Sequence, residues 1–68
     1  MNINKLKSKM VEFGDTQNDL AGAMGISLSR LNAKINNNNA DFRRNEIVFI
    51  SDRYNLNAED IEDIFFAQ

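Results

Sequence analysis

Only one group of side chains in this sequence has the composition of a reactive site, and it is acidic. Four carboxylates stand close together near the C-terminus, at Glu59, Asp60, Glu62 and Asp63. The chain has no histidine and no cysteine, which removes the commonest general base and metal ligand and any thiolate nucleophile. The four acids also lack the alternating ligands and the glycine of a calcium loop. Because negative charge is favourable in the first turn of a helix, we interpret them as capping and solvated residues. We expect no enzyme, no metal and no cofactor.

The charges that remain favour binding, and they are unevenly distributed. The net charge is −2, which is unusual for a domain that binds nucleic acid. Residues 20–44, however, contain four cations and one acid, whereas residues 45–68 contain six acids and one cation. A basic middle and an acidic end can form two opposed faces. Near the N-terminus, Lys5 and Lys9 lie with Glu12 away from the apolar stripe of a helix. A solvated face is the favoured interpretation there, and phosphate contact by a lysine is the alternative.

The segment that must position these groups is residues 16–36, TQNDLAGAMGISLSRLNAKIN. Thr16, with Asp19 three residues later, resembles a capping box and predicts a helix start. Gly25 is placed to end that helix in a left-handed conformation, and Ser27 is placed to cap the next one. So short a connection cannot lay the second helix antiparallel along the first. The pattern therefore predicts a helix-turn-helix.

The second of these helices has two different faces. Leu28, Leu31 and Ile35 recur at i, i+3 and i+7, which predicts an apolar stripe toward the core. On a helical wheel the opposite face is formed by small and polar residues: Ser29, Arg30, Ala33 and Asn36, with Asn32 at the margin. The outward face is therefore expected to be polar, with a single arginine. Gly22, in the preceding helix, suggests close approach of another backbone.

Three further helices are expected around this pair. The first has its stripe at Ile3, Leu6, Met10 and Phe13, and it ends at Gly14. A fourth is capped by Asp41 and has its stripe at Ile47, Ile50 and Tyr54. A fifth is capped by Asn57 with Asp60 and has its apolar face at Ile61, Ile64 and Phe65. The absence of proline and the low glycine content agree with a helical chain.

Some apolar residues are not explained by a single stripe. The run of residues 47–50 is apolar all round, so Phe49 is either buried by a neighbouring helix or part of an interface. A short strand is a weaker alternative for this run. Phe66, next to Phe65 at the end of the chain, suggests a dimer contact. We therefore name Phe49, Phe65 and Phe66 as candidate protein-interface residues.

These elements give one all-α domain, residues 1–68, a compact bundle of about five helices. No apolar run approaches the roughly 20 residues that span a bilayer, so we expect a soluble cytoplasmic protein with no membrane partner.

With these residues placed, the chain resembles the Cro/repressor type of phage helix-turn-helix regulator over about residues 5–66. The resemblance rests on TQNDLAGAMGIS, on Leu31, on the pattern from Phe42 to Tyr54 and on the final apolar residues 64–66. It implies a lambda-repressor-like bundle that binds a double-stranded DNA operator as a homodimer, associated with the nucleoid.

The resemblance also implies the contacts with DNA. The expected DNA-binding residues are Thr16, Gln17, Ser27, Leu28, Ser29, Arg30, Asn32, Ala33, Lys34, Asn36, Arg43 and Arg44. Leu28 stays ambiguous, because periodicity places it at the edge of the core and the resemblance places it in the major groove. The alternative function is an antirepressor or modulator that binds another phage regulator through the same fold. The acidic balance and the surplus apolar residues favour this alternative.

Overall fold

A computed structural model describes residues 2–36 and 42–66, and no strand occurs among them. The helices follow one another as α1 (Ile3–Glu12), α2 (Gln17–Met24), α3 (Leu28–Asn36), α4 (Arg44–Arg53) and α5 (Ala58–Ile61), and α5 continues into the π-helical turn η1 (Glu62–Phe66). The predicted all-α fold of about five helices is confirmed. The predicted cap Asp41 lies outside the described residues.

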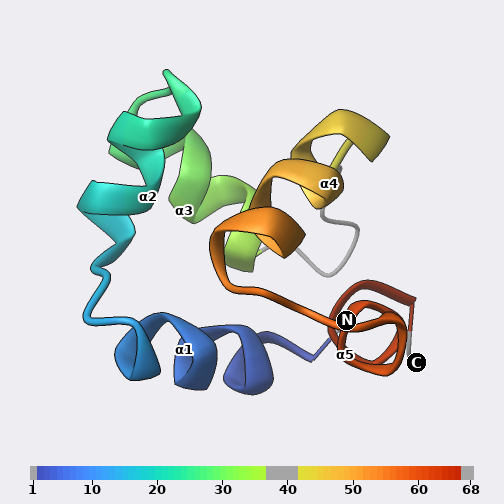
Figure 1. The fold of residues 1–68 in the computed structure, drawn as a ribbon. Helices are drawn as coiled ribbons and strands as arrows, with labels where there is room; N and C mark the ends of the chain where they lie inside the picture. The colour runs from blue at the N-terminus through green and yellow to red at the C-terminus, as the bar shows by residue number, and fades with distance from the viewer. Residues whose placement is uncertain (1, 37–41, 67–68) are drawn as a thin grey trace.

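The core is formed from the predicted apolar faces. Its buried members come from α1 to α4, from Tyr54 at the end of α4 and from η1: Leu6, Met10, Leu20, Ala21, Leu31, Ile35, Ile50, Tyr54 and Ile64. Figure 1 shows α2 and α3 as a pair beside α4, with α1 and α5 on the other side of the molecule. The two ends of the chain meet, because the amide of Asn2 donates a hydrogen bond to the carbonyl of Ile64 at 2.9 Å.

Side-chain caps begin α2 and α5 where the sequence predicts them. The amide of Asp19 donates to Oγ1 of Thr16 at 3.1 Å, and the amide of Thr16 donates to the carboxylate of Asp19 at 3.0 Å. Asn57 and Asp60 form the same reciprocal arrangement at the start of α5, with distances of 2.8 and 3.2 Å. Each cap supplies partners for amides that a helix leaves without intrahelical bonds.

The start of α4 differs from the prediction. The helix begins at Arg44, and the N-cap position is held by Arg43, whose amide donates to the carboxylate of Glu46 at 2.8 Å. The acid that caps the helix therefore lies inside its first turn. The strand alternative for residues 47–50 is wrong, because this segment lies within α4.

Two predictions about α1 and α2 are also wrong. Lys5 and Lys9 do not form a merely solvated face, because Nζ of Lys5 lies 2.7 Å from the carboxylate of Asp63 and 3.2 Å from that of Asp60. The acidic end of the chain thus neutralises α1. Gly22 is not explained by close packing, since a Cβ atom there would meet nothing within 4 Å.

Candidate nucleic-acid interface

A tight turn holds α2 and α3 together. Gly25 ends α2 with φ +72°, a left-handed conformation that favours glycine, and the amide of Ile26 donates to the carbonyl of Ala21 at 3.0 Å. Oγ of Ser27 then accepts a hydrogen bond from the amide of Arg30 at 3.1 Å, as its predicted capping role requires. The sequence therefore fixes both the end of α2 and the start of α3, which pack directly on each other.

The orientation of α3 is set by two buried residues, Leu31 and Ile35. The opposite side is open to solvent as predicted, with exposed side chains at Ser27, Ser29, Arg30, Ala33 and Asn36. The outward face of α3 is thus available to a partner along its whole length.

Leu28 belongs to this open face. It is 40% exposed, whereas Leu31 and Ile35 of the same predicted stripe are buried. An apolar side chain is thereby presented next to Ser27 and Ser29 at the exposed start of α3.

Lys34 and Asn32 are less accessible than their neighbours. Asn32 is half-buried. Only 11% of the Lys34 side chain is exposed, its Nζ lies 3.3 Å from Oε1 of Glu46, and the ammonium lies 5.8 Å from the ring centroid of Phe42. Lys34 therefore links α3 to α4.

Glu46 is the acid at the centre of this link. Burial opposes its ionisation, but the hydrogen bond from the Arg43 amide and the nearby Lys34 ammonium outweigh that effect. The pKa of Glu46 consequently lies below its usual range. The carboxylate is ionised at neutral pH and already occupied by donors from its own chain.

The start of α2 lies in the same helix pair. Thr16 is exposed at the N-cap and Gln17, the first helical residue, is half-buried. The Thr16 hydroxyl already accepts the Asp19 amide, and it can still donate one hydrogen bond and accept one more.

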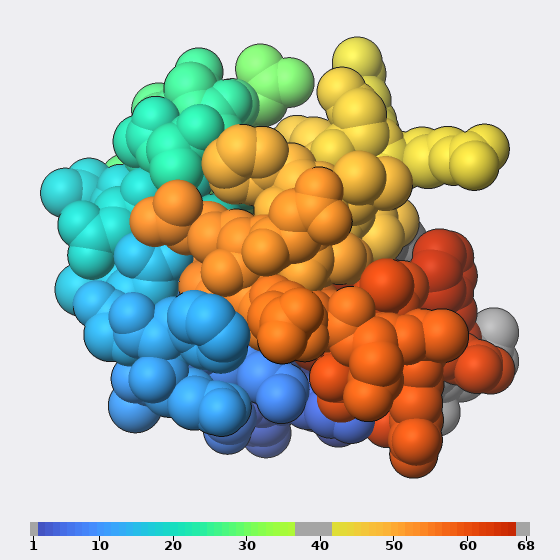
Figure 2. Space-filling model, in the orientation of Figure 1, coloured from blue at the N-terminus to red at the C-terminus, as the bar shows by residue number. Residues whose placement is uncertain are grey.

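The cations of the chain separate into paired and unpaired groups. Lys5, Lys9, Lys34 and Arg53 all form ion pairs with carboxylates. Among the described residues, the side chains of Lys7, Arg30, Arg43 and Arg44 form none. Three of these four lie on α3 or at the start of α4. Side chains at that end of α4, yellow in Figure 2, extend away from the body of the molecule.

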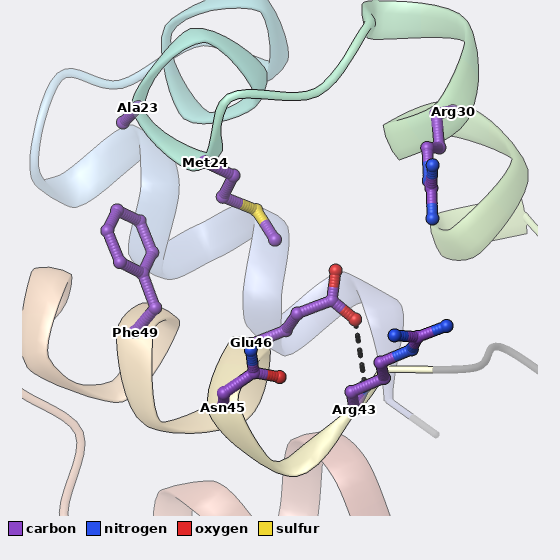
Figure 3. Close-up of a pocket in the computed structure, with 7 residues that line it drawn as sticks. All are labelled: Ala23, Met24, Arg30, Arg43, Asn45, Glu46 and Phe49. Atoms are coloured by element: carbon purple, nitrogen blue, oxygen red, sulfur yellow. Dashed lines mark hydrogen bonds between the residues drawn. The ribbon is translucent and has the colours of Figure 1, made fainter.

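The candidate interface residues differ in exposure. Phe65 is half-buried and packs edge-on against Phe42 with ring centroids 5.5 Å apart, which does not support an interface role. Phe49 is 37% exposed and Phe66 is 64% exposed. Figure 3 shows the ring of Phe49 pointing from α4 toward Ala23 and Met24 of α2. Its own chain therefore covers Phe49 only in part.

Sequence reasoning missed one polar cluster that supports the helix pair. Asp15, directly before α2, accepts hydrogen bonds from Arg53 and from the hydroxyl of Tyr54. Asp15 lies 38 positions from Arg53 and 39 from Tyr54, and no local pattern indicates their contact.

Comparison with protein families covers the whole sequence. Residues 1–68 match the profile of DUF739, described as a protein of unknown function. The chain belongs to the DUF739 family. No curated protein and no solved structure matches this DUF739 sequence. Within residues 2–36 and 42–66 of the DUF739 chain, no helix is long and apolar enough to cross a membrane. In the same described part, no three acidic, histidine or cysteine side chains gather as metal ligands would.

Proposed function

We propose that this protein is a sequence-specific DNA-binding transcriptional regulator that uses α2 and α3 as a helix-turn-helix. One observation supports this most directly. The open face of α3 carries Arg30, which lines a groove together with Arg43 at the start of α4, and Arg44 follows directly. These three exposed arginines have no carboxylate partner in the described part of the chain, while most other cations are neutralised. The net charge of −2 therefore understates the positive charge available beside α3. Affinity for DNA depends on such local charge more than on the total.

The side chains suggest a division of roles. Arg43, Arg44 and the amide group of Gln17 are suited to phosphate contacts, which fix register without reading sequence. Ser27, Ser29 and Asn32 can hydrogen-bond to base edges in the major groove, and Leu28 and Ala33 can pack on thymine methyl groups. Lys34 is better assigned to the fold, because its ammonium pairs with Glu46.

A homodimer would place two copies of α3 in successive major grooves, about 34 Å apart on one face of the DNA. Phe66 is the best candidate for the contact between copies, since it is 64% exposed at the end of η1. Light scattering of wild-type protein and of Phe66→Ser tests this part of the proposal. A wild-type monomer at all concentrations used for DNA binding would contradict it.

A mobility shift on DNA flanking the protein's own gene tests the main proposal. We expect a complex whose affinity falls with rising salt, because phosphate contacts release counterions. Replacing Arg30 and Asn32 by alanine should then reduce sequence preference as well as affinity. Absence of a salt-sensitive complex at micromolar protein would contradict the proposal.

A second function, an antirepressor or modulator that binds another regulator, is favoured by one specific observation. Leu28 presents an apolar side chain at the exposed start of α3, where a DNA reader would gain more from an amide or a guanidinium. Co-purification with a regulator encoded nearby, without DNA binding by this protein alone, would favour this function over the first.

A further inference from the structure

A groove lies between the helix pair and the start of α4. It has a volume of about 260 Å³, and residues of α2, α3 and α4 line it. Figure 3 shows Met24 and Phe49 on one side of it and Arg30 and Arg43 on the other. The groove is therefore apolar on one side and basic on the other.

The groove as a whole is large enough for one aromatic or branched side chain. A cavity of about 150 Å³ suffices to hold a benzene molecule, which is smaller than the space available here. The ring of Phe49 remains 37% exposed, and the adjacent Val48 is 51% exposed. An apolar side chain placed here would cover a surface that the chain itself leaves open.

The arginines on the basic side of the groove favour an acidic ligand. Arg30 and Arg43 have no ion pair among the described residues. Among the described residues, Glu46 is the one acid that lines the groove, and its carboxylate already accepts the Arg43 amide at 2.8 Å and lies 3.3 Å from Nζ of Lys34. The two guanidinium groups can therefore bind carboxylates from outside, for which their planar donor geometry is well suited.

A DNA backbone would satisfy the arginines but not the apolar side of the groove, because phosphates and sugars bring no large apolar group. A protein segment can bring both. We propose that this groove is a docking site for an acidic segment of a partner protein, with one large apolar side chain inserted beside Phe49 and carboxylates on Arg30 and Arg43. Since both arginines also adjoin the face of α3, such a partner would compete with DNA. The predicted competition depends on the proposed DNA-binding function, whereas the docking site does not.

The test uses nuclear magnetic resonance of the whole protein with a synthetic probe. The probe is an alanine-based helical peptide with several glutamates and one central phenylalanine. Amide shifts are expected at Ala23, Met24 and Phe49. A peptide with serine in place of its phenylalanine, and one with lysines in place of its glutamates, should each bind at least about tenfold more weakly, as for loss of an interface anchor. Equal binding of the serine peptide would overturn the proposal, because charge alone would explain it. Absence of shifts at the groove would overturn it too.

Two variants of the protein test whether the peptide binds in the groove. Phe49→Ser should weaken peptide binding at least about tenfold, whereas Val11→Ser, which changes an apolar residue of α1 that is 78% exposed, should not. Arg43→Gln keeps the backbone cap of α4 and should also weaken peptide binding. This second variant tests the groove even if Phe49→Ser fails to fold. Equal binding by wild type and Arg43→Gln would contradict the charge contact.

Other occupants give different results. If duplex DNA binding depends on Phe49 as strongly as peptide binding does, the groove is a DNA surface and the proposal is wrong. If the groove amides shift with protein concentration alone, and Phe49→Ser abolishes this, the occupant is a second copy and the proposal is again wrong. Failure to bind DNA, with peptide binding intact, would contradict the proposed function and leave the docking site standing.

Discussion

The carboxylate of Asp15 accepts two hydrogen bonds from the guanidinium of Arg53, at 2.6 Å from Nε and 2.9 Å from Nη2, although the residues are 38 positions apart. The hydroxyl of Tyr54 donates to the same carboxylate at 2.6 Å. Asp15 lies in the link between α1 and α2, and Arg53 and Tyr54 lie at the end of α4. The cluster therefore fixes where α2 begins relative to α4, and through α2 it positions α3.

Replacing Tyr54 by phenylalanine should lower the free energy of unfolding by about 1–2 kcal/mol, because a hydrogen bond to a charged acceptor is lost. The ring should stay in place, since it is buried and packs edge-on against Phe13 with centroids 5.7 Å apart. Urea unfolding measures the change. In an Asp15→Asn background the same substitution should have a clearly smaller effect. An equal effect in both backgrounds would show that the hydroxyl stabilises the fold by some other contact.

Stability should fall in acid. The hydrogen bond from Arg53, followed by that from Tyr54, lowers the pKa of Asp15 although burial opposes ionisation. The pKa of Asp60 is lowered by the amide of Asn57 and then by Lys5. Because the unfolded chain binds protons more readily, the free energy of unfolding should be level from about pH 5 to neutral pH and decrease as pH falls through the lowered pKa values. Urea unfolding across this range should show a shallower decrease for Asp15→Asn than for wild type.

The chain has one tyrosine, so its ionisation can be observed directly. Burial, then the hydrogen bond to Asp15 and then the negative charge of Asp15, raise the pKa of Tyr54 above its usual value. The neutral phenol is thus favoured in the folded state, and the stability it contributes is present below about pH 10 and is lost as pH rises through the raised pKa. Ultraviolet absorbance should show no tyrosinate near pH 10 in folded protein and normal ionisation in urea. Ordinary titration of the folded protein would contradict the cluster.

Local sequence patterns predicted the helices well because the contacts that begin and end these helices form within a few residues. The reciprocal caps of Thr16 with Asp19 and of Asn57 with Asp60 act over three residues, and the turn at Gly25 depends on its own backbone. These features also gave the position of the candidate site.

Contacts between distant segments were not predicted. Lys5 with Asp63, and Asp15 with Arg53, depend on how whole helices pack, so periodicity places the residues on a face without naming their partners. The exposure of Leu28 has a similar origin, because a helical stripe does not say where the neighbouring helix ends. The basic middle and the acidic end of the sequence were expected to form two opposed faces. In the structure, Asp60 and Asp63 of the acidic end instead pair with Lys5 of α1.

Two glycines of the helix pair should respond oppositely to alanine. Gly22 lies inside α2, and a Cβ atom would meet nothing within 4 Å, so Gly22→Ala should raise the free energy of unfolding by about 1 kcal/mol or slightly less. Gly25 has φ +72°, a conformation that strains other residues, so Gly25→Ala should lower it by about 1 kcal/mol. Thermal and urea unfolding compare the two. If Gly22→Ala instead lowers the free energy of unfolding, α2 requires glycine at this position for a reason other than packing.

The arginine at the start of α4 offers a matched test of the proposed DNA contact. Arg44 and Lys7 are both exposed and both without an ion pair in the described part of the chain, but Lys7 lies on α1. Arg44→Ala should weaken DNA binding on every sequence and reduce the slope of log affinity against log salt by about 1, the expectation for one lost phosphate contact. Lys7→Ala removes the same charge and should leave the slope unchanged. Fluorescence anisotropy over a salt series measures both. Equal losses of DNA affinity in the two variants would mean that the net charge of the chain controls binding. The proposed DNA contact by α3 and the start of α4 would then be contradicted.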